Sequence, residues 1–122
     1  MRVIIADDSE ILRSRLVEML SEIEGIEIVA EAKDTNETIQ AIKAHHPDVV
    51  IMDIRMPGDG GIFAIEAIKK DKKNKPKIIV FTNYPYLQVR KKCMDAGADF
   101  FFYKALEFEK LIKLIKELAR RN

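Results

Sequence analysis

The sequence predicts a single α/β domain in which five parallel strands alternate with five helices. Four short runs of β-branched and aromatic residues have the length and composition of strands buried on both faces of a parallel sheet. Segments with apolar residues at helical spacing separate them. Each of these four strands ends at polar residues that carry chemistry, namely Asp7–Asp8, Asp53, Thr82 and Lys104. These features favour a doubly wound, flavodoxin-like (βα)₅ fold with strand order 2-1-3-4-5.

The first half of the chain supplies three strands and the two helices between them. The strands are predicted at residues 3–6, 26–30 and 49–52. The second strand alternates only partly between apolar and polar residues, which places it at an edge of the sheet. Gly25 ends the first helix. Asp34 or Thr35 can cap the second helix, which must end before Pro47.

The second half supplies two strands and three helices. The strands are predicted at residues 78–81 and 100–103. The helix after the loop at 57–61 carries Ile65 and Ile68, while Pro85 suits the first turn of the next helix, which Gly97 ends. The last helix has one apolar stripe, made of Phe108, Leu111, Ile112, Ile115, Leu118 and Ala119. Right-handed crossovers then cover both faces of the sheet with helices.

The composition predicts one soluble domain over residues 1–122. This length is enough to bury a substantial core, and 48% hydrophobic with 34% charged residues is ordinary for a globular protein. The net charge of +1 favours neither nucleic acid nor a membrane as a partner. No signal peptide and no stretch near the ~20 residues of a membrane span is present. Together with the single cysteine, Cys93, this predicts a cytoplasmic location.

The polar residues at the strand ends predict a phosphate-handling site. The carboxyl ends of parallel strands share one edge, so Asp7, Asp8, Asp53, Thr82 and Lys104 are expected to be neighbours. Crowded carboxylates repel one another, and Mg²⁺ relieves this repulsion while it also binds phosphate oxygens. Asp53 is placed to be a carboxylate nucleophile. Lys104 offers a point charge and Thr82 a hydroxyl donor for the phosphoryl oxygens.

These residues resemble the receiver domains of two-component response regulators, and the resemblance covers the whole chain. The matching positions are the acidic pair Asp7 and Asp8, the phosphoacceptor Asp53 with Pro57 after it, the switch hydroxyl Thr82, the turn Gly97–Asp99, the aromatic switch position Phe101, and the lysine Lys104. Each motif alone is weak. All of them in order at compatible spacing are highly specific.

The resemblance implies a phosphorylation switch rather than an enzyme that acts on a separate substrate. A histidine kinase or phosphotransfer protein would donate a phosphoryl group to Asp53 in the presence of Mg²⁺ or Mn²⁺. The implied metal ligands are Asp7, Asp8, Asp53 and the backbone carbonyl of Arg55. Thr82 would then move towards the phosphoryl group and Phe101 would turn into the vacated space. This repacks the face of the fourth helix, fifth strand and fifth helix, which would bind a downstream protein or a second copy of the chain.

The chain departs from the usual receiver pattern at four positions. Lys104 is followed by Ala105, where the family usually has proline, often after a cis bond; because a cis bond before alanine costs about 3–4 kcal/mol, a trans bond is expected. Phe101 lacks the hydroxyl of the commoner tyrosine. Asn83 stands where a small residue is usual and could restrict access to the acceptor. Gly60 replaces a common aspartate, which makes its loop more flexible.

Several alternatives stay open. The leading hypothesis is a stand-alone receiver of the chemotaxis-regulator kind; a receiver cut from a DNA-binding regulator would normally continue beyond Asn122. An aspartate-nucleophile phosphohydrolase needs a second aspartate two residues after the nucleophile, where this chain has Arg55. A constitutive interaction module would keep the fold without phosphorylation. Locally, Asp8 or Ser9 could simply cap the first helix.

Overall fold

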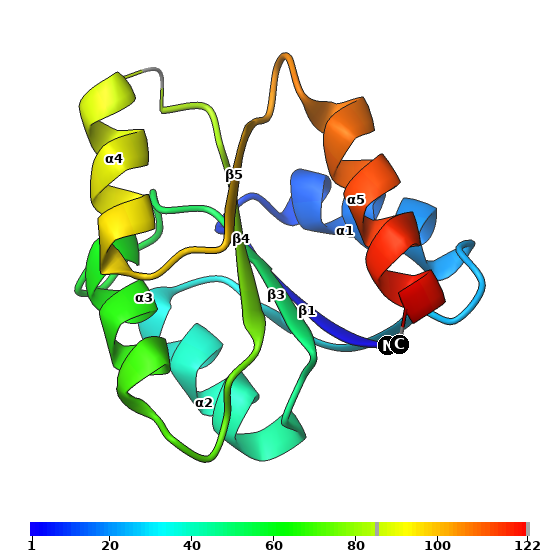
Figure 1. The fold of residues 1–122 in the computed structure, drawn as a ribbon, viewed down its shortest axis with the longest axis horizontal. Helices are drawn as coiled ribbons and strands as arrows, with labels where there is room; N and C mark the ends of the chain where they lie inside the picture. The colour runs from blue at the N-terminus through cyan, green and yellow to red at the C-terminus, as the bar shows by residue number, and fades with distance from the viewer. Residues whose placement is uncertain (85, 122) are drawn as a thin grey trace.

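A five-stranded parallel sheet lies at the centre of the structure, which is a computed structural model that describes residues 1–84 and 86–121 (Figure 1). The strands are β1 (Arg2–Ala6), β2 (Glu27–Ala32), β3 (Val49–Met52), β4 (Lys77–Thr82) and β5 (Phe100–Tyr103). The helices are α1 (Glu10–Ser21), α2 (Thr35–His45), α3 (Gly61–Lys70), α4 (Leu87–Ala96) and α5 (Phe108–Arg121). The sheet order is β2-β1-β3-β4-β5, as predicted. The role expected for Pro85 lies outside the described residues.

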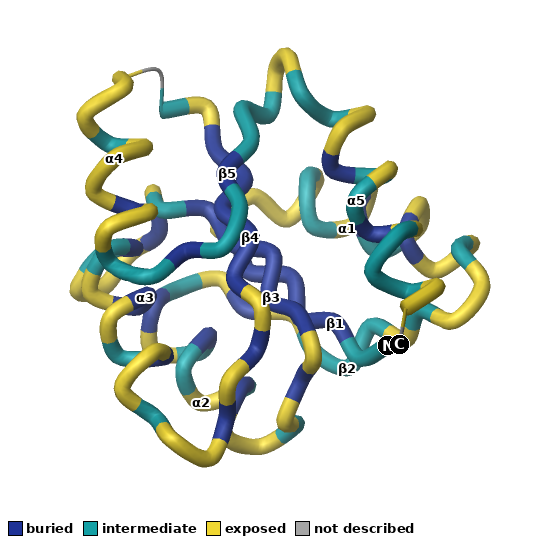
Figure 2. The backbone as a smooth tube through the Cα atoms, viewed as in Figure 1, coloured by how far each residue is buried: buried dark blue, intermediate teal, exposed yellow. Residues whose placement is uncertain are grey.

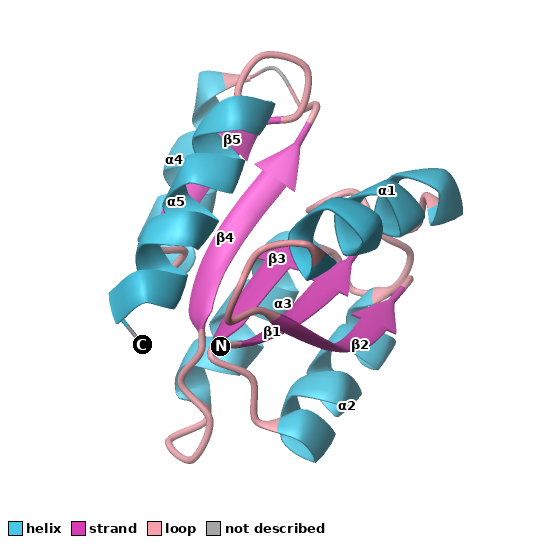
Figure 3. Cartoon of the chain, turned by 90° about the vertical axis from the view of Figure 1, so that its right-hand side faces the viewer, coloured by secondary structure: helices cyan, strands magenta, loops and turns pink. Residues whose placement is uncertain are grey.

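The helices divide between the two faces of the sheet. Figures 1 and 3 show α1 and α5 on one face and α2, α3 and α4 on the other. Because successive strand residues point to opposite faces, Val3 and Ile5 pack with α1 and α5, whereas Ile4 and Ala6 pack with the other three helices. The strands therefore need apolar residues at consecutive positions. The nearly continuous burial of β1, β3 and β4 in the middle of the molecule is visible in Figure 2.

The strand register lines up the residues that follow the strand ends. Ala6 of β1 pairs with Met52 of β3, and Met52 pairs with Val80 of β4. The Asp53 N–H donates to the Ala6 carbonyl over 3.0 Å, and the Asp7 N–H donates to the Ala32 carbonyl over 2.9 Å. The ladder thus continues through the first residue after β1 and after β3. Both aspartates start from fixed backbone positions for this reason.

The helix caps settle two choices that the sequence left open. Ser9, and not Asp8, caps α1, because its Oγ accepts the Leu12 N–H over 3.2 Å. Asp34, and not Thr35, caps α2. The helix ends before Pro47 as expected. None of the described helices combines the length and the apolar character that crossing a membrane requires.

The second strand is longer than predicted. It is an edge strand, as its pattern indicates, but it runs to Ala32 instead of residue 30. A register shift opposite Val3 and Ile4 brings Glu31 and Ala32 into pairing with the end of β1. Glu31 is exposed and polar, so only its backbone pairing makes it part of the strand.

The β3–α3 loop passes very close to the start of α3. The Gly61 N–H donates to the Ile54 carbonyl, and a Cβ at position 61 would overlap the Ile54 Cα. Ile54 directly follows Asp53, so the missing side chain at Gly61 lets the loop fold tightly beside Asp53.

We expect Gly61→Ala to lower the free energy of unfolding by about 1–3 kcal/mol, because backbone must move to relieve the overlap. Gly25→Ala is the matched control: it has a positive φ of 88° but open space around the new methyl group. Its cost should be about 1–2 kcal/mol of backbone strain, with no effect on the acceptor loop. Urea unfolding measures both variants. A Gly61→Ala variant as stable as the wild type would contradict the close approach.

Candidate functional site

One ammonium group joins two buried carboxylates at the carboxyl edge of the sheet. Lys104 Nζ lies 2.5 Å from Asp7 Oδ2 and 2.5 Å from Asp53 Oδ2. Asp7 and Asp53 are only 3% and 6% exposed, and the Lys104 side chain is 13% exposed. The three residues follow β1, β3 and β5. Three strand ends therefore meet at one cation, although Asp7 and Lys104 are 97 positions apart in the sequence.

Both carboxylate oxygens of Asp53 are engaged. Oδ1 accepts the Thr82 hydroxyl over 2.8 Å and the Arg55 N–H over 2.9 Å, while Oδ2 accepts Lys104. The Arg55 bond closes a turn directly after the acceptor, a local pattern that aspartate favours. Thr82, the last residue of β4, is fully buried, so its hydroxyl needs a partner inside the protein. The Asp53 carboxylate is thereby held by a local turn, by β4 and by the residue that follows β5.

Asp7 is held by its own local contacts as well. Its Oδ1 accepts the Ser9 N–H over 2.8 Å, and its backbone carbonyl accepts Arg13 Nη1 over 2.6 Å. These bonds turn the chain from β1 into α1 and orient the Asp7 carboxylate. Nothing in the sequence pattern singled out Arg13, because its partner is a backbone atom.

The pocket holds more negative than positive charge, and the pKa values reflect this. Burial raises the pKa of Asp7, and the hydrogen bonds from Lys104 and Ser9 offset this only in part. The neighbouring Asp53 charge raises it further. Burial lowers the pKa of Lys104, but its hydrogen bonds to Asp53 and Asp7 outweigh this effect, so that the pKa is raised overall. Lys104 therefore stays charged, and additional positive charge at the pocket would be favourable.

The structure brings together two of the three carboxylates that the sequence predicted as neighbours. Asp8 is exposed, and the described part of the chain contains no set of three Asp, Glu, His or Cys side chains placed to hold a metal ion. The Asp7 carboxylate accepts Lys104 inside the pocket, whereas Asp8 lies in the exposed bend that leads to α1. Lys104 takes the place of a third carboxylate beside Asp7 and Asp53. A role for Asp8 in metal binding stays a prediction.

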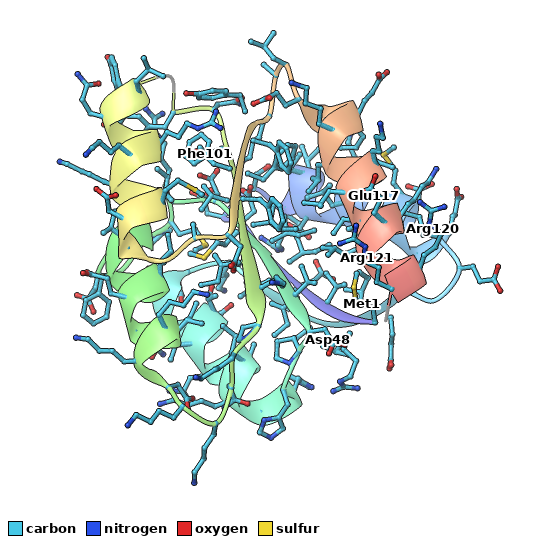
Figure 4. The ribbon with its side chains drawn as sticks, viewed as in Figure 1. Met1, Asp48, Phe101, Glu117, Arg120 and Arg121 are labelled. Carbon is cyan, nitrogen blue, oxygen red and sulfur yellow. The ribbon has the colours of Figure 1, made fainter. Side chains whose placement is uncertain are left out.

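Thr82 and Phe101, the two residues expected to act as a switch, both face the interior. Thr82 donates to Asp53, and Phe101 is only 4% exposed. Figure 4 shows Phe101 on the side of β5 that faces α4, where it belongs to the same core cluster as Cys93. The ring of Tyr103 lies edge-on to it at 5.2 Å. The movement expected of these two residues on phosphorylation stays a prediction.

Three contacts near the acceptor were not predicted. The Arg55 guanidinium lies 4.3 Å above the ring of Tyr84, and the Asn83 side chain accepts the Ala105 N–H over 3.1 Å. Glu107 accepts the Tyr103 N–H over 3.1 Å. The Arg55–Tyr84 and Asn83–Ala105 contacts each join loops that follow different strands, and a local sequence pattern does not reveal such contacts. The Lys104–Ala105 bond is trans, as alanine at this position predicts, since no cis peptide bond occurs in residues 1–84 and 86–121.

Comparison with known proteins agrees with this geometry. Residues 3–116 match the response regulator receiver domain. The chain belongs to this family. The receiver is 41% identical over 118 residues to the transcriptional regulatory protein PdtaR of Mycobacterium tuberculosis, with 97% of the chain and 56% of PdtaR aligned. It is 30% identical over 119 residues to the response regulator GacA of Pseudomonas aeruginosa, covering 96% of the chain and 54% of GacA.

Solved receiver structures superimpose closely on this one. The isolated receiver domain of RcsB from Salmonella enterica, determined with the phosphomimetic BeF3−, has a TM-score of 0.88 and 29% identity, covering 98% of this chain and 88% of that one. A DNA-binding response regulator of the LuxR family from Staphylococcus aureus has a TM-score of 0.87 and 28% identity, covering 97% and 98%. The chain spans about half the length of the curated relatives it matches.

The raised pKa of Asp7 predicts a pH-dependent effect of Asp7→Asn, which removes one negative charge but keeps an oxygen acceptor. Between the ordinary value of 3.8 and the raised value, the folded wild type binds more protons than the unfolded chain, so its stability falls as pH rises through this window. We expect the variant to be more stable than the wild type at pH 7, with a gain that shrinks as the pH falls towards 4. Urea unfolding at both pH values measures this.

Asp59→Asn is the control for this measurement, because Asp59 is an exposed aspartate on the loop after β3. It should change the free energy of unfolding by less than about 0.5 kcal/mol at both pH values. A loss of stability in Asp7→Asn at pH 7 would contradict the excess negative charge inferred for the pocket.

Proposed function

We propose that this receiver is a phosphorylation-activated switch in which Asp53 accepts a phosphoryl group from a histidine kinase or a phosphotransfer protein. The observation that carries the proposal is the acceptor itself: a carboxylate at the end of the central strand, with the Lys104 ammonium on one oxygen and the Thr82 hydroxyl on the other. Thr82 ends β4 and Lys104 follows β5, so the backbone that carries both donors is separate from the loop of Asp53.

The transfer needs a nucleophile and stabilisation of charge. A carboxylate oxygen of Asp53 forms the new O–P bond, while the N–P bond of a donor phosphohistidine breaks and its electron pair returns to the imidazole. The transition state spreads charge over the phosphoryl oxygens. Lys104 and Thr82 are placed to donate to those oxygens, because each already donates to the acceptor at 2.8 Å or less.

The donor set of the pocket fits Mg²⁺. Its atoms are hard oxygens, and burial of Asp7 without full charge compensation favours a cation there. Asp7, Asp53 and the backbone carbonyl of Arg55 would hold the ion, with Asp8 as a further ligand after a change of side-chain position. When bound, Mg²⁺ would neutralise charge on the phosphoryl oxygens. Mn²⁺ prefers similar ligands and would serve in its place.

The geometry does not favour a phosphohydrolase. Such an enzyme needs an acid or base two residues after the nucleophile, and here that residue is Arg55, whose guanidinium lies over the Tyr84 ring. An arginine does not lose its proton in this role. The catalysis we propose is therefore limited to self-phosphorylation and the loss of the phosphoryl group from Asp53.

The output surface that we propose is the face formed by α4, β5 and α5. Thr82 connects the acceptor to β4, and Phe101 connects β5 to α4. A phosphoryl group shifts the balance between two arrangements of these residues only by the difference in its interactions with them. To convert a 1:99 ratio of the two arrangements to 99:1, the phosphoryl group must favour one of them by roughly 5.5 kcal/mol of interaction free energy. A downstream protein or a second copy of the receiver would bind the favoured arrangement.

We expect the protein to gain one phosphoryl group when it is incubated with acetyl phosphate and Mg²⁺. Intact mass spectrometry would detect the adduct, which should be labile to base and absent from Asp53→Asn. Asp59→Asn serves as the control, because it removes an exposed aspartate of the same loop and should react like the wild type. An adduct that persists in Asp53→Asn, or none in the wild type with either small-molecule or phosphohistidine donors, would reject Asp53 as the acceptor.

Mg²⁺ should stabilise the folded protein before any phosphorylation. At a Mg²⁺ concentration ten times the dissociation constant, the free energy of unfolding should rise by about 1.4 kcal/mol. Asp8→Asn should weaken Mg²⁺ binding about tenfold or more if Asp8 becomes a ligand, whereas Asp59→Asn should leave it unchanged. Thermal unfolding across a Mg²⁺ titration measures this. Equal Mg²⁺ affinity in Asp8→Asn and wild type would remove Asp8 from the ligand set.

A further inference from the structure

The loop that carries Lys104 uses all of its backbone donors. The N–H groups of Tyr103, Lys104, Ala105, Leu106 and Glu107 donate respectively to Glu107 Oε1, the Thr82 carbonyl, Asn83 Oδ1, the Tyr103 carbonyl and the Tyr103 carbonyl. Three of these bonds go to backbone carbonyls, and two go to side chains. The loop is thus closed on itself by Glu107 and fastened to the neighbouring strand end by Asn83.

The Asn83 bond joins two departures from the usual receiver pattern. A proline after the lysine has no N–H, so no acceptor is needed there and a small residue suffices across the gap. Ala105 has an N–H, and Asn83 provides the oxygen that accepts it over 3.1 Å. Each substitution supplies what the other requires. Their separation of 22 positions hides this relation in the sequence.

The same bond connects the two donors of the acceptor pocket. Asn83 directly follows Thr82, whose hydroxyl lies 2.8 Å from Asp53 Oδ1. Ala105 directly follows Lys104, whose ammonium lies 2.5 Å from Asp53 Oδ2. The Lys104 N–H also donates to the Thr82 carbonyl over 2.9 Å. The Asn83–Ala105 bond therefore adds a second tie, one residue beyond the last bond of the β4–β5 ladder.

We propose that Asn83 and the Ala105 N–H form a matched pair that positions Lys104, relative to Thr82, for phosphoryl transfer to Asp53. The inference rests on the proposed function and adds Asn83 to it as a positioning residue. Without the pair, the loop after Lys104 keeps its closure by Glu107 but loses one of its two hydrogen bonds to the β4 end. Small displacements of an ammonium that must meet a phosphoryl oxygen reduce the rate of transfer strongly.

A double-mutant cycle tests the pair through the rate of Mg²⁺-dependent phosphorylation by acetyl phosphate. Asn83→Ala should lower the maximal rate about three- to tenfold, since the bond lies at an exposed position. It should leave the acetyl phosphate concentration for half-maximal rate nearly unchanged. In an Ala105→Pro background the N–H is absent, so the further change of Asn83→Ala should have no effect on the rate. Asn36→Ala, an exposed asparagine on α2, is the matched control.

If Asn83 acts only by restricting access to Asp53, the change in phosphorylation rate should have the opposite sign. Asn83→Ala would then react faster, and by the same factor in both backgrounds, and either result would overturn the matched pair. Amide hydrogen exchange gives a second readout that needs neither Ala105→Pro nor phosphorylation. The Ala105 N–H should exchange about tenfold faster in Asn83→Ala than in wild type or Asn36→Ala.

The two proposals can fail separately. A wild type that never takes up a phosphoryl group would overturn the proposed function, and with it the role of the pair in transfer, even if the exchange result showed the bond. A reactive wild type with unchanged exchange at the Ala105 N–H in Asn83→Ala would overturn the pair and leave the proposed function standing.

Discussion

The shared ammonium of Lys104 is the interaction on which the site depends. Two buried carboxylates beside one another would each lose the stabilisation of water and gain mutual repulsion. Lys104 offsets both effects by lying 2.5 Å from each. The compensation is incomplete, as the raised pKa of Asp7 shows. The pocket is therefore stable enough to fold and still short of positive charge, which suits a site that binds a cation and then a phosphoryl group.

The sheet makes this arrangement possible by separating stability from chemistry. Residues along the strands alternate between two apolar clusters, one with α1 and α5 and one with α2, α3 and α4. Every consecutive position of β3 from Val49 to Met52 is buried, and the first residue past this run is Asp53, the proposed acceptor. The packed strands hold the backbone of the site rigid. The polar side chains beyond the strand ends then meet without disturbing either core.

The departures from the common receiver pattern have specific structural counterparts. Ala105 keeps a trans bond and an N–H that Asn83 accepts. Gly60 adopts a positive φ of 93° at the start of α3, a conformation that glycine reaches without strain. Phe101 has no hydroxyl that would need a hydrogen-bond partner, and it is buried against Tyr103 and α4. Beside the Asp53 pocket, the loop after Lys104 is thus held by a hydrogen bond to Asn83, and the aromatic residue of β5 is held by packing.

The sequence by itself determined the elements, the strand order and four members of the site. Long apolar runs and their periodicity suffice for these, because parallel strand ends must share one edge and so bring Asp7, Asp53, Thr82 and Lys104 together. Tertiary structure alone decided that Asp8 stays outside the pocket, that Ser9 caps α1, and that β2 extends to Ala32. It also decided that Asn83 meets Ala105. Those outcomes depend on which side chain reaches which partner across neighbouring strands and loops, and local patterns carry no information about such distant pairs.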